Sequence, residues 1–185
     1  MDNQQIIIAQ NTLKILERKT WNSLHLNDVL SKTKNLNKQS LKQIKNKNDL
    51  LNSINNYFDS QLKKYSKSIE QSNKKDMFFE ILMMRFDILE QYRKSILTIF
   101  DSFKKKPQEL IFLLPSFIDS MIFMAEFSKI PISGLKGNIK IKGLLIVYFS
   151  SFLIWKNDNN KSLEKTMTSL DLYLNRADKL LKIFN

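Results

Sequence analysis

Apolar residues recur every three or four positions through most of the chain, which is the spacing of one face of an α-helix. Near the start, this pattern predicts a helix over residues 4–19, with Trp21 packing just beyond its end. A shorter helix is predicted over residues 27–33, where Val29 and Leu30 are the apolar positions. The predicted buried side of the first helix contains Ile7, Ala9, Leu13 and Leu16.

The same spacing predicts two further helices. The first begins near Asn37, a residue type that often caps a helix, and turns Leu41 and Ile44 inward. The second begins after Asn46, and Asp49 in its first turn suits the positive end of the helix dipole. The predicted apolar face of this long helix contains Leu50, Ile54, Tyr57, Phe58, Leu62, Tyr65 and Ile69.

The rest of the chain is predicted to form helices over residues 76–91, 92–104, 108–128, 139–156 and 161–184. The clearest breaks are KKKPQ and KIPISGLKGN, because proline and glycine stop helices. The whole chain contains only 3 Gly and 3 Pro, and turns between strands depend on these residues. We therefore predict an all-α protein.

The last predicted helix carries apolar residues at alternating spacings of four and three, which is the heptad pattern of helices packed side by side. These residues are Leu163, Met167, Leu170, Leu174, Ala177, Leu181 and Phe184. The helix before it is apolar on nearly every side and needs to be covered on several faces. We predict that two copies form a four-helix dimer interface, with a monomeric bundle core as the alternative. The predicted interface residues are Tyr148, Phe152, Leu163, Met167, Leu170, Leu174 and Leu181.

The two most apolar stretches are residues 111–127 and 143–155. The first is interrupted by Pro115, Asp119 and Glu126, and the second is shorter than the roughly 20 residues that span a bilayer. Both are predicted to be buried helices of a soluble protein, with no integral membrane segment. The N-terminal sequence MDNQQIIIAQ has no basic residue, so no signal peptide is predicted, and we expect a cytoplasmic protein.

Positive charge is concentrated toward the N-terminus. The formal net charge is +12, and residues 1–75 contain 14 basic and 6 acidic residues, whereas residues 76–185 contain 16 and 12. The segment from Lys32 to Lys47 contains six lysines and no acid. Such a field suits a phosphate backbone or an anionic membrane surface.

Side chains suited to catalysis are scarce. The chain has no cysteine, and its one histidine, His25, is predicted to be a turn or cap residue at the start of the short helix. No glycine-rich phosphate loop or nucleophile motif is present. We therefore predict a protein that is not an enzyme and that uses no cofactor or metal.

The short helix and the basic helix after it have the order of a helix-turn-helix, in which the first helix braces the second in the major groove of DNA. Polar side chains on the second helix are predicted to contact base edges and lysines to contact phosphates; a solvated basic helix is the alternative. The predicted DNA-binding residues are Lys34, Asn37, Lys38, Gln39, Ser40, Lys42, Gln43, Lys45 and Lys47.

Residues 4–58 resemble the DNA-binding domain of TetR-family regulators. TWNSLHLNDVL matches the aromatic corner and short helix of the family, and IKNKNDLL matches its closing motif. NLN takes the place of the family's Gly-Val-Ser turn, and QSLK takes the place of its Thr-Leu-Tyr segment, with Lys42 at the tyrosine position. The resemblance implies an N-terminal helix-turn-helix domain of three helices, residues 1–48, and a larger helical ligand-binding and dimerisation domain, residues 49–185.

The C-terminal half is also similar to the TetR-like lipid-binding proteins of ubiquinone biosynthesis. The likeness lies in RFDILEQYRKSI, GLLIVYFSSFLIWKNDN and KTMTSLDLYLNR. In that family, a helix ending in Trp-x-x-Asp is followed by a helix with the pattern Thr-x-x-x-Leu-Asp-x-x-x-x-Arg. The matching residues are Trp155, Asp158, Thr166, Leu170, Asp171 and Arg176.

The TetR resemblance also implies an effector pocket in the larger domain. Met and Phe line adaptable apolar pockets, although plain core packing is the alternative for each of them. Asp119 is expected to be either solvated or paired with Arg85. The predicted pocket residues are Met83, Phe86, Phe112, Phe117, Asp119, Phe123 and Phe127.

These patterns predict a homodimeric TetR-like transcriptional regulator, a repressor, that binds a near-palindromic site in double-stranded DNA. A small apolar ligand or lipid is its expected effector. One alternative is a lipid-binding accessory protein on the same fold, with degenerate DNA binding. Another is an interaction module with neither activity.

Overall fold

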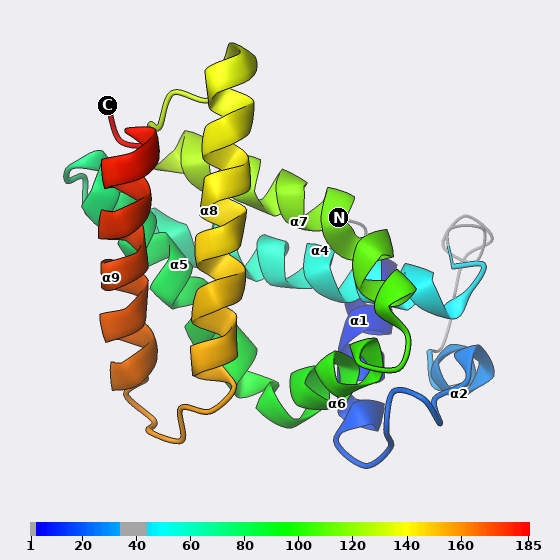
Figure 1. Cartoon of the computed structure of the whole chain (residues 1–185). Coiled ribbons are helices and arrows are strands. Elements are labelled where there is room, and N and C mark those ends of the chain that lie inside the picture. Colours follow the sequence, from blue (N-terminus) through cyan, green and yellow to red (C-terminus); the bar gives the residue numbers. More distant parts are fainter. Residues whose placement is uncertain (1–2, 34–43) are drawn as a thin grey trace. The chain divides into compact units, whose positions relative to one another are not determined.

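The computed structural model describes residues 3–33 and 44–185, and every regular element in these ranges is helical (Figure 1). The predicted all-α class is thereby confirmed. The chain divides into two compact units. Unit 1 comprises Met1–Gln61 and Ile88–Ser116, and unit 2 comprises Leu62–Asp87 and Phe117–Asn185.

Unit 1 is built around α1 (Asn3–Leu16), which packs against α2 (Leu26–Leu30) and α6 (Arg93–Phe103). The Ser95 hydroxyl donates a 2.7 Å hydrogen bond to the carbonyl of Leu13 and ties α6 to α1. Helix α1 ends three residues earlier than predicted. Its buried side also differs from the predicted one, because Ile7, predicted to be buried, is exposed and the neighbouring Ile8 is buried instead.

Helix α4 (Lys47–Tyr65) begins at the predicted cap. The Asn46 side-chain oxygen accepts the backbone N–H groups of Asn48 and Asp49, at 2.8 and 3.2 Å. In return, the Asp49 carboxylate accepts the N–H groups of Lys45 and Asn46, at 2.8 and 3.0 Å. This reciprocal capping satisfies donors that a helix start otherwise leaves unpaired. The early turns of α4 contribute buried side chains to unit 1.

The end of α4 was predicted too late. The helix stops at Tyr65, which is exposed, and a short 3-10 helix, η1 (Ser66–Ser68), follows, so Ile69 lies outside α4. The hydroxyls of Ser66 and Ser68 donate to backbone carbonyls three residues earlier. Serine bonds of this kind compete with the backbone hydrogen bonds of a helix, which explains the early end.

The next three helices lie close to their predicted bounds. They are α5 (Lys74–Gln91), α6 and α7 (Pro107–Phe127). Tyr92 separates α5 from α6 with a non-helical backbone, φ −119° and ψ 23°. Its hydroxyl lies 2.9 Å from that of Tyr57, which holds this break against α4 within unit 1.

In unit 2, α8 (Gly134–Trp155) and α9 (Glu164–Leu181) run antiparallel, side by side (Figure 1). Helix α8 begins five residues before its predicted start, because the glycines that suggested a break belong to the helix. Gly134 has φ +66°, a conformation that favours glycine. A Cβ at Gly137 would lie only 1.9 Å from the carbonyl oxygen of Ile132, so the backbone of the preceding turn packs directly on this position.

Two helices of the described residues, α7 and α8, are long and apolar enough to cross a membrane by length and composition alone. The second apolar stretch forms only part of α8, which has 22 residues, so its helix is longer than the stretch alone. Only 28% of the most apolar window of α7 and 44% of that of α8 are buried. Core helices of soluble proteins also satisfy the length and composition test, so the finding by itself is weak evidence for a membrane span.

Candidate nucleic-acid interface

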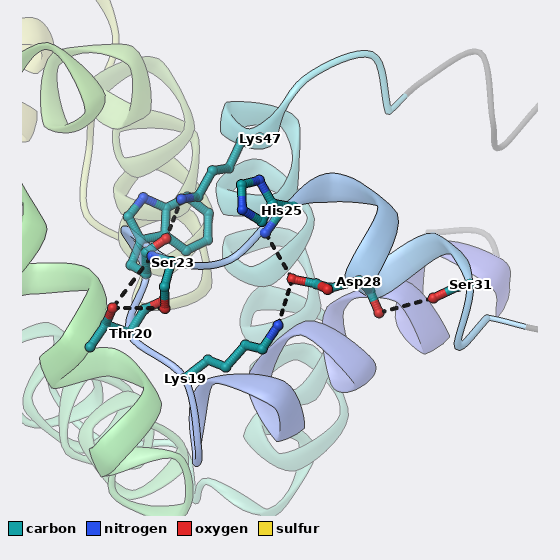
Figure 2. Close-up of polar contacts among 8 residues, drawn as sticks. Lys19, Thr20, Ser23, His25, Asp28, Ser31 and Lys47 are labelled. Carbon is teal, nitrogen blue, oxygen red and sulfur yellow. Dashed lines mark hydrogen bonds and ion pairs between the residues drawn. The ribbon is translucent and has the colours of Figure 1, made fainter.

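The corner between α1 and α2 lies in unit 1, and its polar contacts fix the start of α2 (Figure 2). The Asp28 carboxylate accepts the backbone N–H of His25 at 3.0 Å and pairs with the Lys19 ammonium at 3.0 Å. The hydrogen bond from His25, followed by the one from Lys19, lowers the pKa of Asp28. His25 occupies the N-cap position with an extended backbone, which confirms its prediction as a cap residue.

The far end of α2 is held against α1. The Thr33 hydroxyl donates to the carbonyl of Val29 and accepts from the Asn11 side-chain amide, both at 3.0 Å. Val29 is fully buried. Both ends of this five-residue helix therefore have specific anchors.

Lys47, in the first turn of α4, is a predicted phosphate contact that the structure places against Trp21. Its ammonium donates to the Trp21 carbonyl and lies 4.6 Å from the centre of the Trp21 ring (Figure 2). Desolvation lowers the pKa of Lys47, and the negative charge of Glu109 partly opposes this shift. Lys47 would have to leave Trp21 to reach a phosphate, so its role in DNA binding stays a prediction. Lys45, by contrast, is exposed.

Trp21 is the centre of a buried network that the sequence revealed only in part. Its indole N–H donates to the Glu109 carboxylate at 2.8 Å, and the Ser102 hydroxyl, which donates to the carbonyl of Ile99 at 2.6 Å, lies 3.2 Å from the same carboxylate oxygen. The Trp21 backbone N–H donates to the Thr98 hydroxyl at 3.2 Å. The corner after α1 is thus fixed to α6 and to the first turn of α7. Packing of Trp21 was predicted, whereas Glu109 was missed because an acid in a first turn ordinarily suggests only a favourable helix dipole.

Most of the predicted DNA-binding residues lie outside the described part of the chain. Directly after them, Ile44 is buried as predicted, and its neighbours Lys45 and Asn46 begin the cap of α4. The residues outside the described ranges are Lys34, Asn37, Lys38, Gln39, Ser40, Lys42 and Gln43, together with Leu41.

The predicted pocket residues are not gathered around one described cavity. Phe86 is fully buried, and its ring stacks on Tyr148 at 5.7 Å, which is core packing. Phe112 belongs to unit 1 and is exposed, whereas the other six belong to unit 2. Asp119 is exposed, in agreement with the solvated alternative. The half-buried members of the set are Met83, Phe117, Phe123 and Phe127.

Most of the predicted dimer residues pack within a single chain. Two members differ: Met167 is 43% exposed, and Leu181 is half-buried against Gly143. The buried members cover the core side of α8 and α9, as the alternative of a monomeric bundle core expects, and a dimer contact through them stays a prediction. These buried members are Tyr148, Phe152, Leu163, Leu170 and Leu174.

A different apolar face of α8 remains uncovered. Leu135 is 79% exposed and Ile146 is 67% exposed, and two more apolar residues continue the same face at heptad spacing. We name this set the α8 stripe; it consists of Leu135, Ile139, Ile146 and Leu153. The heptad search could have found it, but Lys142 interrupts the apolar run at the position between Ile139 and Ile146.

The residues that carry the second predicted resemblance make structural contacts in this chain. Asp158 is buried and accepts the backbone N–H and the hydroxyl of Thr166, both at 2.9 Å, which caps the first turn of α9. Trp155 and Leu170 are fully buried. Asp171 pairs with Lys75 at 2.8 Å on the surface of unit 2.

No family model matches the chain, and a comparison with curated proteins finds no match. The class of protein is therefore inferred from the motifs in the sequence and from the contacts described above.

Proposed function

We propose that the chain is a TetR-like, homodimeric DNA-binding regulator of transcription that acts as a repressor. The observation that supports this best is α2, a helix of five residues held to its neighbours at both ends by Asp28 and Thr33. It precedes a segment in which lysines recur without any acid. A braced short helix before a basic segment is the arrangement expected of a helix-turn-helix.

Dimerisation is proposed through the α8 stripe. An exposed apolar face of this length on a long helix is costly in water, and a second copy placed about a two-fold axis would cover it with its own stripe. The two DNA-binding domains related by that axis would recognise a near-palindrome. An apolar ligand would act as effector only to the extent that it binds more tightly to the dimer with one spacing of these domains than to the dimer with another spacing.

The DNA-binding proposal predicts that the triple substitution K38A/Q39A/K42A weakens binding to a specific site about 100-fold or more, since it removes phosphate and base contacts together. The measurement is a mobility shift with DNA from the gene's own neighbourhood at several salt concentrations. The K161A/K165A pair is the matched control, since both lysines are exposed on unit 2. Weak, sequence-blind binding that the triple substitution leaves unchanged would refute the proposal.

The dimer proposal predicts that I146K/L153K converts a dimer to a monomer, because two cations would be buried at the contact. Light scattering coupled to size exclusion measures the mass directly. Leu172→Lys is the control, since Leu172 is exposed on α9 outside the α8 stripe. A wild-type chain that is monomeric at all accessible concentrations contradicts the proposed contact.

A further inference from the structure

The first turns of α7 present an apolar face to solvent, immediately after three consecutive lysines. Ile111 is 64% exposed and Phe112 is 39% exposed, whereas Glu109 and Leu113 on the other side of the helix are buried. We name the exposed set the α7 entry surface. It consists of Lys104, Lys105, Lys106, Ile111, Phe112 and Pro115, all in unit 1 and all exposed.

The charge of this surface is positive because the nearby acids are occupied. Asp101 pairs with Lys104 at 2.9 Å, which compensates one of the three lysines. The Glu109 carboxylate faces the interior, where the Trp21 indole N–H donates to it. Three consecutive exposed lysines therefore directly precede the turns of α7 that expose Ile and Phe side chains.

We propose that the α7 entry surface docks on an anionic lipid bilayer. The lysines would lie among the lipid phosphates, and Ile111 and Phe112 would enter the boundary between headgroups and acyl chains, as in helices that lie in the membrane interface. In this orientation the helix would lie along the membrane surface, with Glu109 in its first turn held in the protein interior by Trp21. This inference does not depend on the proposed regulatory function.

Lipid fits this surface better than the other candidate partners do. A DNA backbone would attract the lysines but would leave exposed Ile and Phe in contact with water and phosphate. A second copy docked on the same surface about a two-fold axis would bring two lysine clusters together, which is unfavourable. An anionic bilayer offers negative charge at its surface and an apolar layer just beneath it.

The test uses the full chain and two kinds of vesicle. One contains phosphatidylcholine alone, and the other also contains about 30% phosphatidylglycerol, which gives it a negative surface. We expect flotation with the anionic vesicles and little with the neutral ones. Each Lys→Gln substitution at 105 or 106 is expected to weaken binding about fivefold. I111S and F112S are expected to weaken it about tenfold each.

Matched variants distinguish vesicle binding by this surface from nonspecific binding of the chain to lipid. K161Q/K165Q removes two exposed lysines from unit 2, and L180S removes a more exposed apolar side chain that lies on α9, outside the α8 stripe, so both are expected to bind like the wild type. In a Phe112→Trp variant, brominated lipid is expected to quench the new indole. Trp21 and Trp155 are fully buried and serve as internal references.

Three results would overturn the proposal. The first is a Phe112→Trp side chain that brominated anionic vesicles do not quench. The second is loss of DNA binding in the lysine variants with unchanged vesicle binding, which would assign the surface to DNA. The third is a change of oligomeric mass in I111S/F112S, which would assign it to a contact between copies. The vesicle assay contains no DNA, so failure of the proposed regulatory function leaves its result intact.

Discussion

Replacing Glu109 with alanine is expected to lower the free energy of unfolding by about 1–3 kcal/mol, since the buried Trp21 indole N–H loses its acceptor, whereas the Ser102 hydroxyl keeps the carbonyl of Ile99 at 2.6 Å. The half-buried Lys47 ammonium would also lose the negative charge that opposes its desolvation, so its pKa is expected to fall further. Denaturant unfolding followed by Trp21 fluorescence, in a Trp155→Phe background, measures the loss.

Two variants control for this substitution. Glu109→Gln keeps an oxygen acceptor for Trp21 and is expected to restore part of the stability. Glu126→Ala removes an exposed acid from the same helix and is expected to change stability by no more than about 0.5 kcal/mol. If Glu109→Ala were as stable as the wild type, the buried network would not hold the corner as described.

The substitution Asp158→Ala is expected to cost about 2–3 kcal/mol of unfolding free energy. The carboxylate is buried and accepts two hydrogen bonds from Thr166 and one from the backbone of Asn160, so its removal leaves the first turn of α9 without its cap. Asp171→Ala, which removes an exposed carboxylate paired with Lys75, is the control and is expected to cost about 0–1 kcal/mol. Equal losses in the two variants would contradict the capping role.

The pH dependence of stability gives an independent check on Asp158. Burial is the largest influence on this carboxyl and opposes ionisation, but the hydrogen bonds from Thr166 and Asn160 together outweigh it, so the pKa of Asp158 is lowered. A lowered pKa in the folded state stabilises the fold above the unfolded pKa of about 3.9, and this stabilisation is lost as pH falls through the folded value. Unfolding free energies measured from pH 7 to pH 2 should therefore fall less steeply in Asp158→Asn.

The helical fold could be predicted from the sequence because its signals are local. The start of α4 is an example: Asn46 and Asp49 form their cap from residues only three apart, and both are visible in the sequence. The break at Tyr92 likewise agrees with the predicted boundary between two helices to within a residue.

Features that depend on contacts between distant residues could not be predicted in the same way. Trp21 and Glu109 are 88 positions apart, and neither residue indicates the other. The seam of α9 illustrates a second limit. Its spacing correctly indicated side-by-side packing, but Leu170 and Leu174 face α8 of the same chain. Periodicity shows that a face is covered, and it does not show whether the covering helix belongs to the same chain or to another copy.

The contact at Gly137 limits which residues evolution can accept there. Any other amino acid would drive its Cβ into the carbonyl oxygen of Ile132, and a backbone atom cannot move aside as a flexible side chain can. The position therefore depends on the path of the α7–α8 turn. Relatives that keep this turn are expected to keep glycine at 137 even where their surfaces differ. A relative with another residue there must build the turn differently.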